Sequence, residues 1–80
     1  MTKVKMNSER FKAFLAERNI SQNRLAQKAG ITSAFMSQIL SGVRNPSSKT
    51  RTKILEAINA GQRFRGDKEY EFSDIFRVSK

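Results

Sequence analysis

The sequence predicts an all-α fold, a compact bundle of four to five helices. Apolar residues recur at spacings of three and four in several separate stretches, which is the period of an amphipathic helix. A Ser or Thr precedes these stretches and a Gly or Asn follows them, as expected for helix caps. With 80 residues, the chain is long enough for one small domain with a single hydrophobic core.

The first two helices are expected at about residues 9–18 and between Ser21 and Gly30. Ser8 is the expected N-cap of the first helix, and Asn19 is its expected end. Gly30 can adopt the left-handed conformation that ends the second helix at low cost. The apolar faces are Phe11, Phe14 and Leu15 in the first helix and Leu25, Ala26 and Ala29 in the second.

Two further helices are expected after the second one. The third carries an apolar face and closes near Ser41-Gly42, whereas the fourth follows a loop at residues 43–46 and ends before Gly61. The apolar faces are Met36, Ile39 and Leu40 in the third helix and Ile54, Leu55 and Ile58 in the fourth. The expected N-caps are Thr32 or Ser33 for the third helix and Ser47 or Ser48 for the fourth.

The two ends of the chain differ from the helical part. Residues 1–7 are expected to form a basic N-terminal arm, residues 8–60 the helical domain, and residues 61–80 a C-terminal extension. Within the extension, Gly66-Asp67 could turn a short hairpin. Ser73 is expected to cap a short closing turn, Asp74-Ile75-Phe76, that packs on the core.

Composition excludes several classes of function. The chain contains no Cys and no His, so disulfides, thiolate chemistry and the usual zinc or iron sites are not expected. No phosphate-binding glycine-rich loop and no paired carboxylates are present, so we expect no enzyme activity, no cofactor and no small-molecule substrate. No apolar run is long enough to span a bilayer, and we expect no membrane contact and a cytoplasmic, nucleoid-associated location.

The charge of the chain is concentrated in its helical part. The formal net charge is +9, and residues 18–55 contain seven Lys or Arg but no Asp or Glu. A surface of this kind attracts a phosphate backbone. Charge alone would equally suit an anionic lipid or mere solubility, so the pattern of the helices has to decide between them.

Residues 22–41 have the pattern of a helix-turn-helix, in which the second helix can enter the major groove of DNA. Small Ala26 permits close approach of the two helices, and Gly30 turns the chain. An ordinary helical hairpin would show the same periodicity. The missing acidic residues have no packing explanation, however, whereas docking on DNA requires their absence. The sequence therefore favours double-stranded DNA as the partner.

The same segment resembles the lambda-repressor-like helix-turn-helix family of Cro and repressor type. The resemblance covers roughly residues 8–60, and residues 72–76 are similar to the short closing helix common in that family. It implies a bundle of four or five helices that binds operator DNA, often as a dimer, and regulates transcription. It rests on Ser21-Gln22-Asn23-Arg24-Leu25-Ala26, Ala29-Gly30-Ile31-Thr32, and the run from Met36-Ser37-Gln38 to Asn45-Pro46-Ser47.

The resemblance also implies roles for individual residues. Gln22 matches the glutamine that contacts a phosphate and braces the recognition helix. The groove-facing, base-reading positions are Ser33, Ala34, Ser37 and Gln38. The chemistry agrees, since Gln38 can pair bidentately with adenine and the Ala34 methyl can meet a thymine methyl. The expected phosphate contacts are Gln22, Asn23, Arg24, Thr32, Ser41, Arg44, Asn45 and Lys49.

Two positions depart from the family pattern. Arg24 stands where an acidic residue is frequent, a placement that a bound phosphate would explain. The link at residues 62–72 is longer than usual, which affects the expected dimer geometry.

Two other features have alternative interpretations. Phe35 either packs on the first two helices or meets the groove edge. Lys3 and Lys5 either follow the DNA backbone or form a loose terminus.

The leading hypothesis is a sequence-specific repressor of the kind found in phages and mobile elements, acting as a homodimer on a palindromic operator. In that hypothesis, residues 61–80 help to close the core and carry self-association. One alternative is an antitoxin or auxiliary regulator of the same fold that binds a protein partner through residues 61–80. Another is a protein-interaction domain without a DNA role, anchored by Phe64, Tyr70 and Phe72.

Overall fold

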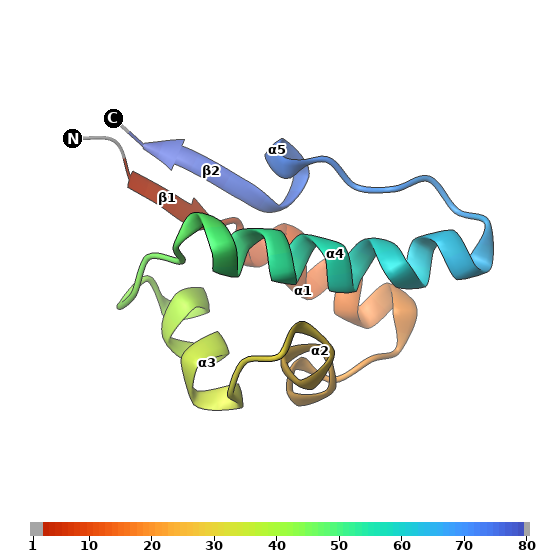
Figure 1. Cartoon of the computed structure of the whole chain (residues 1–80), viewed down its shortest axis with the longest axis horizontal. Helices are drawn as coiled ribbons and strands as arrows, with labels where there is room; N and C mark the ends of the chain where they lie inside the picture. Colours follow the sequence, from red (N-terminus) through yellow and green to blue (C-terminus); the bar gives the residue numbers. More distant parts are fainter. Residues whose placement is uncertain (1–2, 80) are drawn as a thin grey trace.

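Five helices and a two-stranded β-ribbon make up the computed structural model, which describes residues 3–79 (Figure 1). The long helix α4 crosses the molecule, with α1 behind it, α2 and α3 on one side, and the ribbon on the other. The predicted all-α bundle of four to five helices is confirmed, and the ribbon is an addition to it. The bounds are β1 Lys3–Met6, α1 Ser8–Arg18, α2 Gln22–Ala29, α3 Ser33–Ser41, α4 Ser48–Arg65, α5 Phe72–Ile75 and β2 Phe76–Ser79.

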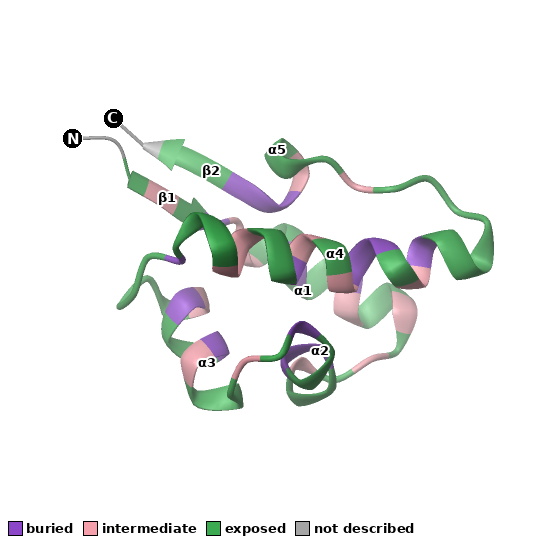
Figure 2. Cartoon of the chain, viewed as in Figure 1, coloured by how far each residue is buried: buried purple, intermediate pink, exposed green. Residues whose placement is uncertain are grey.

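One hydrophobic core joins these elements. The inward faces of α1 to α4 supply most of its residues, and Met6, Ile75 and Phe76 from the chain ends complete it (Figure 2). The predicted apolar faces of α2 and α3 are buried at Leu25 and Met36. The fully buried large side chains are Phe11, Leu25, Met36, Ile39, Ile54, Ile58 and Ile75.

Side-chain caps start the first four helices. Asn7, rather than the expected Ser8, caps α1, because its Oδ1 accepts from the Arg10 N–H at 3.3 Å. Of the alternatives at α3 and α4, Thr32 and Ser47 are the caps. The expected Ser21 caps α2, and the left-handed residues at the helix ends are Asn19, Gly30, Gly42 and Gly66.

Helix α4 continues to Arg65, so the prediction that it ends before Gly61 was wrong. Gly61 lies inside the helix without a positive φ, whereas Gly66, with φ 76°, ends it. The Asp67 N–H donates to the Gln62 carbonyl at 2.9 Å, which closes the helix end. The hairpin considered at Gly66-Asp67 is therefore not formed, because this pair terminates a helix instead.

The segment after α4 is held by buried amides of α4. Asn59 donates from Nδ2 to the Tyr70 carbonyl at 2.9 Å and accepts the Tyr70 N–H at 2.7 Å. Gln62 Nε2 donates to the Lys68 carbonyl at 2.8 Å. The Tyr70 ring meets Phe14 edge to face, with centroids 5.5 Å apart. These contacts pin an extended segment along α4, and nothing in the hydrophobic pattern indicated them.

The two ends of the described chain pair as the β-ribbon. Strands β1 and β2 are antiparallel, with Val4 opposite Val78 and Met6 opposite Phe76. Residues 3–6 of the expected basic N-terminal arm therefore form strand β1 rather than a loose terminus, and Met1 and Thr2 lie outside the described residues. Four residues with two alternating apolar side chains gave too short a pattern to predict a strand.

Helix α5 leads into β2. It begins at Glu71, which forms a reciprocal capping box with Asp74, so the expected Ser73 cap was wrong. Ile75 is buried and its carbonyl accepts the Asn7 N–H at 2.7 Å. The Phe72 ring stacks on Phe76 with centroids 5.1 Å apart. The closing helix therefore ties the start of α1 to the end of the chain.

Candidate DNA interface

Helix α3 presents one small, polar face to solvent. Thr32 caps it, its Oγ1 accepting the Phe35 N–H at 3.0 Å, while Met36 and Ile39 point into the core. The outward face is exposed along the helix (Figure 2). The exposed residues include all four expected base readers, Ser33, Ala34, Ser37 and Gln38.

A side-chain hydrogen bond braces this helix. Gln22 Nε2, at the start of α2, donates to Ser37 Oγ at 2.9 Å. The turn between the helices is fixed as well, since the Ile31 N–H donates to the Ala26 carbonyl at 3.0 Å and Gly30 is left-handed. Ser37 uses an acceptor site for the brace, so its hydroxyl proton remains available to donate to a base.

The N-terminus of α2 has the character of an anion site. Ser21 Oγ accepts the Arg24 N–H at 3.1 Å, which leaves the N–H groups of Gln22 and Asn23 without intrahelical partners. The Asn23 and Arg24 side chains are exposed beside them. The helix dipole and the Arg24 charge can therefore attract one phosphate together.

The loop between α3 and α4 is tied down at both ends. The Arg44 N–H donates to the Gln38 carbonyl at 3.1 Å, and the Arg44 guanidinium lies over the Phe35 ring at 5.9 Å. Pro46 is buried, and Arg51 Nη1 donates to its carbonyl at 2.9 Å. Phe35 is half-buried against the core, which agrees with the packing alternative for this residue.

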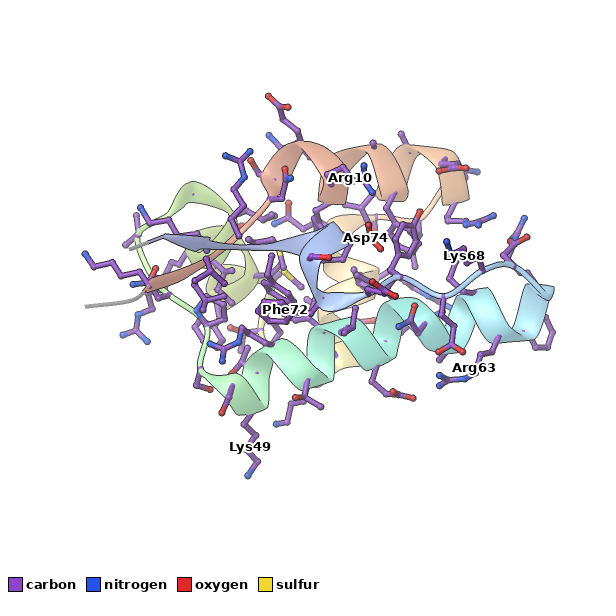
Figure 3. All side chains as sticks on the ribbon, turned by 90° about the horizontal axis from the view of Figure 1, so that it is seen from above. Arg10, Lys49, Arg63, Lys68, Phe72 and Asp74 are labelled. Atoms are coloured by element: carbon purple, nitrogen blue, oxygen red, sulfur yellow. The ribbon has the colours of Figure 1, made fainter. Side chains whose placement is uncertain are left out.

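The remaining expected phosphate contacts lie on either side of this loop. Asn45 is exposed within it, and Ser41, exposed at the end of α3, donates from its hydroxyl to the Gln38 carbonyl at 3.2 Å. Lys49 is exposed in the first turn of α4 and projects away from the helix (Figure 3). The expected phosphate contacts thus lie at the starts of α2, α3 and α4, at the end of α3 and in the loop between α3 and α4.

Charges are segregated in the molecule. All five ion pairs found among residues 3–79 involve α1, α4, the segment between α4 and α5, and Asp74 of α5. The pairs are Arg10–Asp74, Arg18–Asp67, Arg63–Glu56, Arg63–Glu69 and Arg65–Asp67. Hydrogen bonds from Arg63 to Glu56 and Glu69 raise its pKa above the ordinary value, and it stays charged. Within this part of the chain, no such pair neutralises Arg24, Arg44 or Lys49.

Residues 11–60 match the family model of the helix-turn-helix, a span from the first turns of α1 to most of α4. The chain belongs to the lambda-repressor-like helix-turn-helix family. Members of this family are DNA-binding regulatory proteins, so the exposed face of α3 lies where a helix-turn-helix presents its recognition helix. The ribbon and α5 lie outside the matched residues. No curated protein and no solved structure was found to match the chain.

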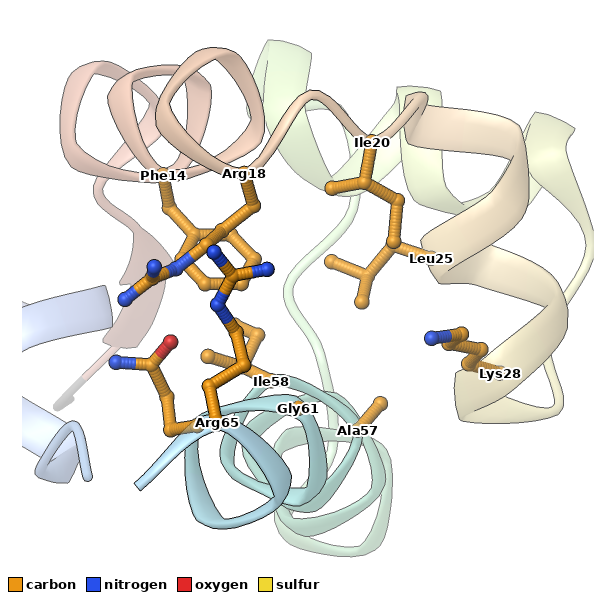
Figure 4. A pocket seen from close by; sticks show the side chains of 10 residues that line it. Phe14, Arg18, Ile20, Leu25, Lys28, Ala57, Ile58, Gly61 and Arg65 are labelled. Atoms are coloured by element: carbon orange, nitrogen blue, oxygen red, sulfur yellow. The ribbon is translucent and has the colours of Figure 1, made fainter. Parts of the chain in front are cut away.

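A separate hollow lies between α1, α2 and α4 (Figure 4). Its volume is about 130 Å³, and its lining includes apolar Phe14 and Leu25 together with three cationic side chains, Arg18, Lys28 and Arg65. Arg18 Nε is buried without a hydrogen-bond partner. None of the expected DNA contacts lines this hollow, so it is distinct from the candidate interface.

Of the helices formed by residues 3–79, none combines the length and apolar character needed to cross a membrane. Nor does that part of the chain gather three or more metal-binding side chains in one place.

The three aromatic residues considered as anchors for a protein partner differ in their packing and exposure. Tyr70 packs on Phe14, and Phe72 stacks on Phe76 under the Arg51 guanidinium at 5.8 Å. Phe64, in contrast, is 93% exposed near the end of α4.

Proposed function

We propose that this domain is a sequence-specific regulator of transcription that reads the major groove with α3. The observation that supports it most is the small polar face of α3, exposed beside cations without acidic partners and braced by the Gln22–Ser37 bond. Small side chains let the helix approach base edges closely, and polar ones can pair with them. The proposed activity is repression by occupying an operator, as in small regulators of phages and mobile elements.

The proposed base-reading and phosphate-binding roles follow from the chemistry of each side chain. The Gln38 side-chain amide can donate to N7 of adenine and accept from its N6 amino group. The Ala34 methyl can contact the methyl group of thymine. Ser33 and Ser37 can bond to several bases. The groups proposed to hold phosphates are the side chains or backbone N–H groups of Gln22, Asn23, Arg24, Thr32, Ser41, Arg44, Asn45 and Lys49.

Two copies on a palindromic operator are part of the proposal. Phe64 at the C-terminal end of α4 offers the exposed aromatic surface that two copies could share. In α5 and β2, Ile75 and Phe76 are buried within the fold, and Phe72 is 38% exposed against 93% for Phe64. Self-association on DNA therefore rests on Phe64 rather than on α5.

The test is selection of bound sequences from a random duplex pool with the full chain. We expect two related half-sites with centres about 10 bp apart, and binding that weakens steeply as salt increases. The Phe64→Ser variant should bind single half-sites but lose cooperativity on the full site. No enriched sequence, together with salt-independent binding, would instead favour a protein-interaction domain.

A further inference from the structure

The outer face of the β-ribbon is basic. Side chains alternate between the two faces of a strand, so Val4 and Met6 point toward the core side while Lys3 and Lys5 lie on the opposite face with Arg77. All three cations are exposed. No ion pair within residues 3–79 involves any of them.

Two of these cations are direct cross-strand neighbours. Lys5 stands opposite Arg77 in the antiparallel register. Like charges placed directly opposite each other destabilise a strand pair. The ribbon has only two strands, so there is no neighbouring strand to supply a compensating acid. The arrangement weakens the ribbon in the free protein and would be relieved by an anion bound between the two side chains.

The position of the ribbon indicates which anion this is. Strand β1 contacts α3, and the ribbon extends over the end of the molecule where α3 and the start of α4 lie (Figure 1). The ion-paired acidic residues are Glu56 on α4, Asp67 and Glu69 in the segment that follows α4, and Asp74 on α5. A duplex docked on α3 would therefore continue toward a basic surface rather than an acidic one.

We propose that Lys5 and Arg77, assisted by Lys3, form a clamp for the phosphate backbone of duplex DNA beyond the helix-turn-helix contacts. This inference rests on the proposed function, since it needs a duplex bound at α3. Both strands contribute to the clamp, so it exists only while the two ends of the chain are paired. Part of the DNA affinity is thus coupled to formation of the ribbon.

Charge reversal at either member of the pair separates this role from a structural one. Arg77→Glu and Lys5→Glu each replace a like-charged pair with an opposite pair. Each should therefore raise the Tm of the free protein by about 1–5 °C. Each should also make the slope of log K against log salt shallower by about one unit and lower affinity for duplex DNA at least about fivefold at low salt. A gain in stability with a loss of binding is the expected signature.

The control is Lys68→Glu, which changes the net charge equally. Lys68 lies near the far end of α4 from the ribbon (Figure 3), and it is exposed. Its reversal should leave the salt slope unchanged. The double variant Lys5→Glu/Arg77→Glu restores a like-charged pair, so its Tm should fall back while its binding is weakest. The neutral variant Arg77→Gln provides a second measurement of the slope.

Three outcomes would overturn the clamp. If Arg77→Glu and Arg77→Gln leave the salt slope of the wild type unchanged, the cations do not contact phosphate. If the variants lose binding to vesicles containing an anionic lipid but keep duplex affinity, the partner is a membrane surface. If the wild-type chain shows no salt-dependent duplex binding at all, the proposed function itself fails, and that result is distinct from the first two.

Discussion

Gln38 is the largest of the exposed polar side chains proposed to read bases on α3, and its carbonyl helps to fix the loop that follows. A bidentate pair with adenine distinguishes that base from the others. We therefore expect Gln38→Ala to cost about 1–3 kcal/mol of binding on the selected site and to relax the preference at one base pair. Quantitative binding to the selected site and its single-base variants measures both effects.

The matched control is Gln27→Ala, since Gln27 is an exposed glutamine on α2 outside the proposed contacts. Its removal should leave the sequence preference intact. Equal losses by Gln38→Ala on selected and random DNA would contradict base reading at this position.

The bond between Gln22 and Ser37 joins the two helices through side chains alone. A double-mutant cycle with Gln22→Ala and Ser37→Ala should give a coupling of about 0.5–1 kcal/mol in the free energy of unfolding. Denaturant unfolding of the free protein measures it without DNA, so that base or phosphate contacts do not contribute. Additive effects of the two substitutions would show that the bond does not brace α3.

At the scale of elements, α4 acts as the support for the segment that follows it. Asn59 presents its amide to the backbone of Tyr70 as a neighbouring strand would. Asn59→Ala removes both hydrogen bonds at a buried position, and we expect a loss of about 1–3 kcal/mol in the free energy of unfolding. The control Asn45→Ala, in an exposed loop, should change it by less than about 0.5 kcal/mol. A loss no larger than that of the control would show that the Asn59–Tyr70 hydrogen bonds do not stabilise the segment.

The elements that the sequence predicted correctly are those with several agreeing local signals. Helices α2 and α3 have a cap, an apolar period and a terminal glycine, and the structure follows all of these. Gly61 misled the prediction for α4 because a glycine ends a helix only where the chain takes a left-handed conformation, which Gly66 does instead. The ribbon pairs residues from opposite ends of the described chain. A local sequence pattern cannot predict which distant segment a strand pairs with.

The candidate interface shows a similar division. The exposure of Gln38 and its neighbours follows from helical periodicity, which can be read from the sequence. The contact of Arg44 with Phe35 and the role of Arg51 on Pro46 could not be read in this way. Both depend on how the loop folds back, which is set by tertiary packing rather than by spacing.

At the scale of the whole molecule, cations held in ion pairs and cations outside them should contribute differently to DNA binding. Arg24→Ala and Arg44→Ala should each make the slope of log K against log salt shallower by about one unit on any duplex. Arg63→Ala should not, because Arg63 is bound to Glu56 and Glu69 at the other end of α4 (Figure 3). Salt titrations on selected and random duplexes measure the slopes. A slope that changes equally in all three variants would point to net charge rather than to local phosphate contacts.

The pairing of β1 with β2 also sets an order of events in folding. Contacts within and between α1 to α4 join residues in one continuous part of the chain, whereas the ribbon closes a loop that contains nearly all of it. Closing so long a loop costs entropy that must be offset by structure already formed. The helix-turn-helix can therefore fold before β1 pairs with β2. The ribbon would then form last and open first, which makes the chain ends the place where amide hydrogens exchange soonest.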